Sequence, residues 1–230
     1  MRIYGIGDLH LSFTSDKPMD IYGGQWTNHT ERLEQNWRRI IEPDDIVILA
    51  GDISWGLKRE EAEADLAWIA GMPGKKVLIK GNHDLWWTSV SKLNEYDASM
   101  YFIQNTSYLA GNIAICGTRG WICPGDPDYT EHDNKIYQRE LGRMRLSLEA
   151  GAKSGAQEII AAIHYPPAND LEQGSGFTEL FEEYKVSQVI YGHLHGTDAQ
   201  RKGIRGNRNG VEYSLVACDH LACVPLLLTR

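Results

Sequence analysis

Five short apolar runs, each followed at once by polar or charged residues, are the feature that most constrains the fold of this chain. The runs and the residues that follow them lie within Ile3–His10, Ile46–Asp52, Val77–Asp84, Ile159–His164 and Val189–His195. A short continuous apolar run is typical of a strand that is buried on both faces of a sheet. Such strands occur mainly in parallel sheets, in which helices connect successive strands. The pattern therefore predicts an α/β fold.

The segments between the first three runs have the periodicity of helices. We expect one helix to begin at a cap on Asn28 or Thr30 and to end at Ile41, and a second to cover Leu57–Ala70. After the third run, a helix is expected to extend to Tyr96. Strands and helices that alternate in this way predict right-handed crossovers, with ligands beyond the carboxyl ends of the strands.

The second half of the chain is richer in turns. Here we expect a hairpin of Ser107–Leu109 with Ile113–Cys116, a loop or lid over Thr118–Asp133, helices over Asn134–Ala150 and Phe177–Lys185, and closing strands over Val211–Ala217 and Val224–Leu228. Because Pro225 lacks an amide hydrogen, the last strand is expected at a sheet edge. No linker or repeat interrupts the pattern, so a single domain is expected over residues 1–230.

Residues that bind metals or move protons stand at all five expected strand ends. They are Asp8, His10, Asp52, Asn82, His83, Asp84, His164, His193 and His195. Any one of them alone is more often a hydrogen-bonded residue at a strand end. Their recurrence at five ends favours a shared site, and residues two apart in extended chain, such as Asp8 and His10, point to the same side.

The mixture of imidazoles, carboxylates and one amide indicates which metals the site prefers. These ligands suit manganese first, with iron, zinc, nickel or cobalt as alternatives, and they are too rich in nitrogen for calcium or a dedicated magnesium site. The four cysteines show no paired spacing and are expected to be reduced thiols. A formal net charge of −8 disfavours nucleic acid as a partner, whereas two divalent ions inside the site attract a small phosphoester.

The motifs Asp8-Leu9-His10, Gly51-Asp52, Gly81-Asn82-His83-Asp84, His164 and Gly192-His193-Leu194-His195 resemble the five blocks of the calcineurin-like metallophosphoesterases, in the same order. The residues around these motifs are similar to those of a group of bacterial predicted phosphohydrolases. The resemblance implies a two-sheet β-sandwich flanked by helices, an αββα architecture. It also implies a dinuclear phosphohydrolase, in which a hydroxide that bridges the metals attacks the phosphorus.

The resemblance assigns a role to each residue of the motifs. It implies Asp8, His10 and His195 as ligands of one metal, Asn82, His164 and His193 as ligands of the other, and Asp52 as the bridge between them. It further implies that His83 protonates the leaving oxygen and that Asp84 orients His83. One departure is the sequence Ser54-Trp55-Gly56, which stands where the protein serine/threonine phosphatases of this superfamily carry an Asp-Arg pair, and this disfavours a protein phosphatase.

Two residues outside the motifs are candidate substrate contacts. Trp55 follows the second strand end and could stack on a flat group, although core packing is the default for tryptophan. Arg119, in the Gly- and Pro-rich loop, is a candidate phosphate clamp. The basic loop Arg201–Arg208 is expected to be a solvated loop, with a phosphate contact as the less favoured alternative. His29 is expected to have a surface or capping role.

The expected function is the hydrolysis of a small phosphodiester or phosphomonoester, with a nucleotide as one option. The alternatives are a nuclease of the same superfamily and a non-catalytic metal-binding interaction module. No apolar run approaches the ~20 residues that span a bilayer, and Met1–Gly7 has no signal-peptide core, so a cytoplasmic protein without a membrane partner is expected.

Overall fold

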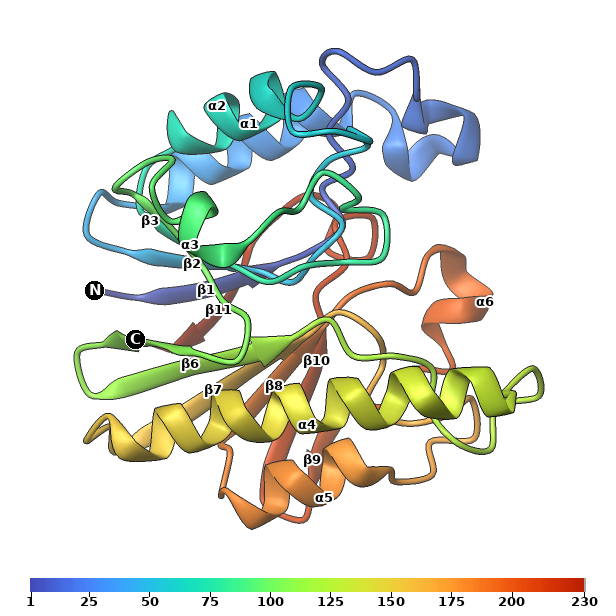
Figure 1. Ribbon diagram of the computed structural model, residues 1–230. Coiled ribbons are helices and arrows are strands. Elements are labelled where there is room, and N and C mark those ends of the chain that lie inside the picture. The colour runs from blue at the N-terminus through green and yellow to red at the C-terminus, as the bar shows by residue number, and fades with distance from the viewer. Residues whose placement is uncertain (230) are drawn as a thin grey trace.

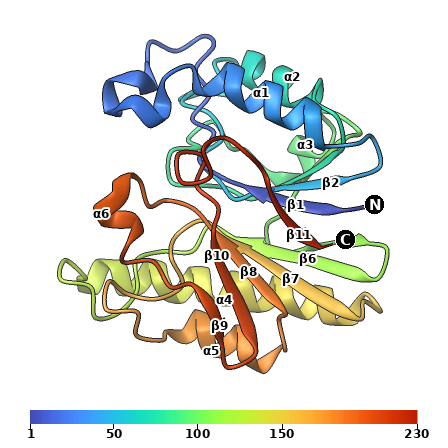
Figure 2. The same cartoon turned by 180° about the vertical axis from the view of Figure 1, so that it is seen from behind.

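The computed structural model describes residues 1–229, in which two β-sheets lie face to face between two layers of helices (Figure 1). Figure 2 shows the same order of layers from behind. The αββα sandwich expected from the resemblance is therefore confirmed. Arg230, the last residue of the expected domain, lies outside the described residues.

The first sheet is mostly parallel. Its strands are β1 (Ile3–Ile6), β2 (Ile46–Leu49), β3 (Lys75–Leu78), β4 (Met100–Phe102) and β11 (Leu226–Thr229), in the order β11-β1-β2-β3-β4. Strands β1 to β4 pair in parallel, whereas β11 is antiparallel to β1 and occupies an edge. The prediction of a closing strand at an edge is therefore confirmed.

The second sheet has a parallel centre and antiparallel edges. Its strands are β5 (Ser107–Ala110), β6 (Ile113–Thr118), β7 (Glu158–Ile163), β8 (Gln188–Tyr191), β9 (Gly206–Arg208) and β10 (Val211–Leu215), in the order β5-β6-β7-β8-β10-β9. The β5–β6 hairpin has the expected antiparallel pairing. Strand β9, which pairs with β10, lies in the segment that was expected to be a basic loop.

The helices cover the outer face of each sheet. The α-helices are α1 (His29–Ile40), α2 (Glu63–Ala70), α3 (Val90–Leu93), α4 (Glu131–Lys153), α5 (Gly176–Glu183) and α6 (Gly196–Gln200), and two 3-10 helices cover Met19–Tyr22 and Gly24–Trp26. Helices α1 and α2 lie on the first sheet, and α4 and α5 lie on the second (Figure 1).

Alternation along each strand divides the apolar side chains between three core layers. On β1, Ile3 packs between the two sheets, whereas Tyr4 faces the layer of α1 and α2. Isoleucine and valine predominate between the sheets, as expected for strands that are covered on both faces. The four cysteines are free and buried, as expected.

Two helix predictions were too long, and one began too late. Residues 57–62 form turns, and Leu57, expected inside, is 58% exposed. Between Asp84 and Val90 the adjacent Trp86 and Trp87 are both buried, which a surface helix disfavours because its neighbouring side chains point about 100° apart. Helix α4 begins before Asn134 because Thr130 and Asp133 form a capping box.

Candidate metal centre

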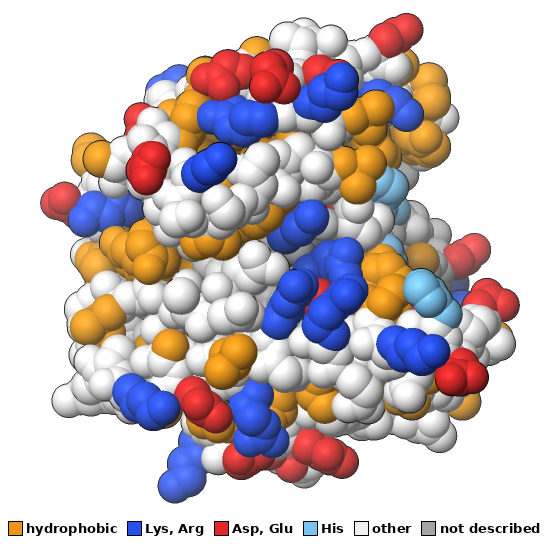
Figure 3. Space-filling model, in the orientation of Figure 1, with side chains coloured by type: hydrophobic (Ala, Val, Ile, Leu, Met, Phe, Trp, Pro, Cys, Tyr) orange, Lys and Arg blue, Asp and Glu red, His pale blue; other side chains and the backbone are white. Residues whose placement is uncertain are grey.

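The carboxyl ends of the parallel strands from both sheets meet at one edge of the sandwich. An isolated bridge between Gly7 and Ala217 joins the sheets there, with the Gly7 amide 2.8 Å from the carbonyl oxygen of Val216. Figure 3 shows that this edge is hollowed and that histidine side chains are visible in the hollow. The two marked termini lie at the opposite end of the sheets (Figures 1 and 2).

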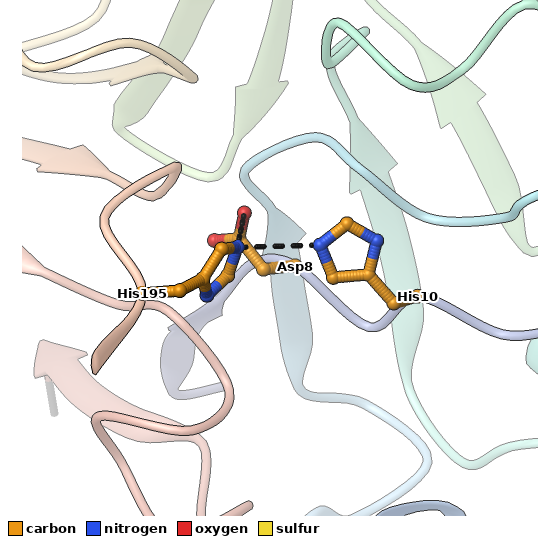
Figure 4. Close-up of side chains that lie close together, drawn as sticks. All are labelled: Asp8, His10 and His195. Atoms are coloured by element: carbon orange, nitrogen blue, oxygen red, sulfur yellow. Dashed lines mark hydrogen bonds and ion pairs between the residues drawn. The ribbon is translucent and has the colours of Figure 1, made fainter. Parts of the chain in front are cut away.

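The first group of expected ligands consists of Asp8, His10 and His195, which point toward one another (Figure 4). The Nε2 atoms of His10 and His195 are 3.3 Å apart, and His195 Nε2 is 3.4 Å from Asp8 Oδ1. The other nitrogen of His195, Nδ1, lies 3.1 Å from Oδ1 of Asp219. Because that carboxylate accepts the Nδ1 proton, Nε2 of the neutral ring presents a lone pair to the centre of the group.

The second group contains Asn82, His164 and His193. Asn82 Oδ1 lies 2.8 Å from His164 Nε2 and 3.0 Å from His193 Nδ1. His164 Nδ1 is 2.9 Å from the carbonyl oxygen of Ala50, which can only accept a proton. When the His164 ring is neutral, as a metal ligand must be, its Nε2 lone pair is directed at the amide oxygen of Asn82.

Asp52 lies between the two groups. Its Oδ2 atom is 3.4 Å from His164 Nε2 in the second group and 3.8 Å from His10 Nε2 in the first. Ligand atoms of Asp8, Asp52 and His164 lie within 4.8 Å of one another, as do those of Asp8, His10 and His195. One carboxylate oxygen thus faces both clusters, the position expected of a bridging ligand.

The atoms that converge here fit divalent cations. Carboxylate oxygens, an amide oxygen and imidazole lone pairs face one another at short range, and such acceptors require a shared proton or a positive ion between them. The absence of thiolate and the mixture of nitrogen with oxygen suit manganese, iron, zinc, cobalt or nickel. This agrees with the ligand chemistry expected from the sequence.

Burial and charge act strongly on the buried titratable groups. Burial lowers the pKa of His10 to about 4 and that of His193 to about 3. Burial acts in the same direction on His164, but the Asp52 and Asp8 carboxylates outweigh it and raise the pKa of His164 to about 9. The pKa of Asp52 is lowered, because His164 and His10 outweigh the effect of burial. The pKa of Asp8 is lowered as well, so the carboxyl groups of Asp8 and Asp52 are both ionised at neutral pH, as cation binding requires.

The backbone at these strand ends is strained. Asp8, His10, Asp52 and His193 all have positive φ, of 56°, 45°, 50° and 71°. The left-handed conformation is costly for residues other than glycine, and it persists where surrounding structure enforces it, often at functional sites. Here it turns each side chain into the hollow directly after its strand or strand-end turn.

His83 stands at the open side of the centre. Its side chain is 44% exposed, and its Nε2 lies 4.0 Å from Asp52 Oδ2. The prediction that Asp84 orients the His83 ring is wrong. The buried Asp84 carboxylate instead accepts hydrogen bonds from the backbone amides of Gly81, Ile53 and Ser54, and from the indole of Trp86. It therefore fixes the loops that carry Asp52 and Asn82.

The candidate substrate residues have different surroundings. Trp55 lies at the hollow, with its ring centroid 4.8 Å from that of His10 and 4.4 Å from that of His83. Arg119 Nη2 pairs with the buried Glu140 at 3.2 Å, and its guanidinium lies over the ring of Trp121, while its role as a phosphate clamp stays a prediction. Trp86 and Trp87 are core residues, which is the default interpretation of their sequence position.

The basic loop and His29 are the other two positions for which the sequence gave an expectation. Within the basic loop, Lys202 pairs with Asp170 at 2.6 Å and Arg208 with Glu172 at 2.6 Å, whereas the Arg201 side chain is 80% exposed and Arg205 donates to the carbonyl oxygen of Gln200. His29 is buried rather than on the surface, and its Nε2 lies 3.1 Å from the carbonyl oxygen of Leu9.

Sequence reasoning missed Asp219. Its carboxylate holds His195 and also accepts from the Gly196 amide and the Gln200 side chain, at 3.1 and 2.9 Å. The signal was present, because Asp219 and His220 follow the β10 strand just as the other site residues follow theirs. The end of β10 could therefore have been added, as a sixth, to the five strand ends that were expected to form the site.

The family model of the calcineurin-like phosphoesterases matches residues 1–197. The chain belongs to this family. The match covers every strand end from Asp8 to His195, so it contains both groups of candidate ligands.

Two phage proteins are similar to part of this chain. The Gene 66 protein of Mycobacterium phage L5 is 35% identical over 77 residues, which are 34% of this chain and 37% of that protein. The Gene 66 protein of Mycobacterium phage D29 is 33% identical over 83 residues, which are 36% of this chain and 40% of that protein. The matched region thus spans about two fifths of the length of these curated relatives.

A solved structure shares the fold of this protein over nearly the whole chain. It is a protein of unknown function from Aquifex aeolicus, which is 15% identical with a TM-score of 0.53, over 98% of this chain and 95% of that one. At this identity the likeness shows the fold alone. Within residues 1–229, no helix combines the length and the hydropathy that a membrane crossing requires.

Proposed function

We propose that this calcineurin-like phosphoesterase is a metal-dependent hydrolase of small phosphoesters. In this proposal Asp8, His10 and His195 hold one cation, Asn82, His164 and His193 hold a second, and Asp52 binds both. The observation that carries the proposal is the position of Asp52 Oδ2, which faces His10 of one group and His164 of the other. Manganese is the metal we expect first, because the ligands mix nitrogen and oxygen without thiolate.

In this proposal some residues bind the metal ions, others orient those ligands, and one transfers a proton. When bound, two divalent ions supply positive charge to the phosphoryl oxygens and lower the pKa of a water between them. The backbone amide of His193 donates to Asp8 at 3.0 Å, and the carbonyl of Ala50 orients His164, so both ligands are held in place before a substrate arrives.

His83 is the residue that we assign to the leaving group. It is the histidine of the Gly81–Asp84 motif, it lies beside Asp52, and much of its ring faces solvent. In that position it can donate a proton to the departing alkoxide of a substrate bound in the hollow. The histidines that are buried among carboxylates are engaged as ligands and are less accessible to a leaving group.

Neither alternative function has a comparable basis in the described structure. A nuclease needs a cationic track for a phosphate backbone, but the net charge is −8 and the basic residues Lys202 and Arg208 are paired with acids. A non-catalytic module needs only a metal or a surface, and it does not require His83 next to a complete set of ligands.

A hydrolysis panel tests the proposal. Purified protein would be stripped of metal, reloaded with manganese, nickel, iron or zinc, and assayed on chromogenic phosphomonoesters and phosphodiesters and on nucleotides. We expect turnover of at least one class with at least one metal, and its loss in Asp52→Asn. The conservative Asp20→Asn, at an exposed position in the 3-10 helix Met19–Tyr22, is the matched control. Absence of turnover with every metal and substrate would overturn the enzymatic proposal.

A further inference from the structure

We propose that the cavity beside His83 is the subsite for the leaving-group alcohol, and that it takes an uncharged, flat aromatic group. This inference rests on the proposed function, because it assumes that a phosphoester binds at the candidate metal centre. It adds the chemical class of the substrate, which neither the family nor the metal ligands specify.

The cavity opens directly from the centre. It has a volume of about 470 Å³, within the roughly 300–1,000 Å³ that is usual for small-molecule sites. His10, His83 and His195 line its inner end, so a group placed in it is next to the first cluster of ligands and to the proposed proton donor. Figure 3 shows hydrophobic side chains above the hollow at this edge.

The outer walls are apolar and aromatic. Met19, Tyr22, Trp26 and Trp55 line them, and all come from the two loops that follow β1 and β2. No Asp, Glu, Lys or Arg is among the described residues that line the cavity. Lys17 Nζ lies 5.4 Å from the ring centroid of Trp55 but is not part of the lining. A charged leaving group would therefore lose its hydration in the cavity and find no charged side chain in its lining, whereas an aromatic ring gains stacking and apolar burial.

The aromatic wall is held in place before a ligand binds. The indole nitrogen of Trp55 lies 3.3 Å from Met19 Sδ, and its ring packs on His10 at an interplanar angle of 21°. Trp26 is buried against His29 and His195, with centroid distances of 5.3 and 5.4 Å. Fixed aromatic walls favour flat ligands, because little conformational entropy is lost when such a ligand binds.

A second cavity on the other side of the centre does not suit the same group. It is smaller, about 200 Å³, and it adjoins His193 and Tyr165 rather than His83. Three carboxylates, those of Asp126, Asp128 and Asp170, are among the residues that line it. The position of His83 on the larger cavity therefore assigns the leaving group to the aromatic side.

The rim extends the apolar surface outward. Ile21 and Tyr22, in the 3-10 helix Met19–Tyr22, are 71% and 62% exposed although both are large and apolar or aromatic. Exposed apolar residues that are grouped beside a cavity are typical of a ligand-binding site. Figure 1 shows this segment projecting above the edge where α6 projects below it.

Two phosphonates that differ only in their organic group test the inference without turnover. Phenylphosphonate and methylphosphonate carry the same charged group, and neither has a phosphoester bond to hydrolyse. We expect isothermal titration of the manganese-loaded protein to show that phenylphosphonate binds at least about tenfold more tightly, since stacking on an aromatic side chain is worth about 1–3 kcal/mol per ring. Equal dissociation constants would overturn the inference.

Variants locate the discrimination in this cavity. Trp55→Ala should reduce the ratio of the two dissociation constants to below about threefold, whereas Trp55→Phe should retain most of the preference. Tyr22→Asp, at an exposed position, places a charge at the rim without disturbing the core and should weaken only phenylphosphonate. Asp128→Ala, in the second cavity, is the control and should change neither constant.

The outcomes distinguish this inference from the function on which it rests. If the hydrolysis panel shows turnover but the two phosphonates bind equally, the proposed aromatic subsite is refuted and the proposed hydrolase function is not. If neither phosphonate binds and no ester is hydrolysed, the proposed function fails, and the subsite fails with it. A preference for phenylphosphonate that Trp55→Ala and Tyr22→Asp leave intact would place the subsite elsewhere and refute this assignment.

Discussion

His195 and Asp219 are joined through a contact of 3.1 Å between Nδ1 of the ring and Oδ1 of the carboxylate. The contact places the proton of the neutral ring on Nδ1 and turns Nε2 toward Asp8 and His10. Carboxylates in this position orient metal-bound histidines and increase their basicity. Asp219 therefore belongs to the candidate centre although no motif of the sequence includes it.

Replacement of Asp219 by alanine should weaken metal binding. Loss of a carboxylate that orients a histidine ligand typically costs 10- to 100-fold in metal affinity, and we expect a fall of about that size for manganese. Isothermal titration of metal-stripped protein measures the change. Asp198→Ala, which removes an exposed carboxylate from the same helix α6, is the control and should leave the affinity unchanged. Equal affinities in the two variants would contradict the role of Asp219.

Replacement of His83 by alanine should separate catalysis from metal binding. We expect kcat to fall by about 10²- to 10⁴-fold, the usual contribution of general acid catalysis, while the metal content of the protein stays the same. The loss should be largest for substrates with alkyl leaving groups and smallest for 4-nitrophenyl esters, because a nitrophenolate needs little protonation. His132→Ala, an exposed histidine at the start of α4, is the control. A loss independent of the leaving group would refute proton donation by His83.

The parallel half of the fold could be predicted because its signals are local. The run Ile46–Ala50 is apolar throughout, and β2 is buried on both faces, as such runs require. The same logic placed Asp8 and Asp52 at the ends of β1 and β2 and His164 at the end of β7 in the other sheet, and the structure brings ligand atoms of the three within 4.8 Å of one another. Sequence periodicity is sufficient here because the carboxyl ends of parallel strands lie at one edge.

The features that could not be predicted depend on contacts between distant segments. Residues 57–62 have helical composition, but the carbonyl oxygen of Glu61 accepts a hydrogen bond from the distant Thr14 side chain, and the segment forms turns. Arg119 was expected to be a phosphate clamp, but its Nη2 donates a hydrogen bond to Glu140, 21 residues away. Asp84 stands beside His83 in sequence, yet its carboxylate faces Ile53 and Ser54. In each case a tertiary partner, which the local pattern does not contain, decides the role.

Asp45 should make the stability of the protein depend on pH in the acid range. Although burial alone would raise its pKa, hydrogen bonds from Arg2 and from the Glu42 amide hold the pKa of Asp45 below its ordinary value of 3.8. A carboxyl group whose pKa is lower in the folded protein stabilises the fold above the unfolded pKa, and this contribution is lost as the pH falls. The difference between wild type and Asp45→Asn should therefore be constant from about pH 7 to 5 and shrink below about pH 4.

Urea unfolding at a series of pH values measures this difference in the free energy of unfolding. Asp44→Asn changes the neighbouring exposed carboxyl group and should give a curve parallel to that of the wild type. A difference between wild type and Asp45→Asn that grows toward low pH would have the wrong sign and would contradict the assignment to Asp45.

Gly81 and Gly192 allow the two central carboxylates to lie against the backbone of neighbouring loops. A Cβ at Gly81 would overlap Asp52 Oδ1, and a Cβ at Gly192 would overlap Asp8 Oδ2. Either alanine variant must displace a proposed ligand, so we expect a loss of stability of about 1–3 kcal/mol, as for other overpacked sites, and a metal affinity at least about tenfold lower.

Gly142→Ala is the matched control, because an added Cβ there has no atom within 4 Å and Gly142 is exposed within α4. It should raise the free energy of unfolding by about 0.5–1 kcal/mol and leave metal binding unchanged, since alanine favours the helix. If Gly81→Ala and Gly192→Ala bind manganese as tightly as Gly142→Ala, then Asp52 and Asp8 are not held where the proposed centre requires them.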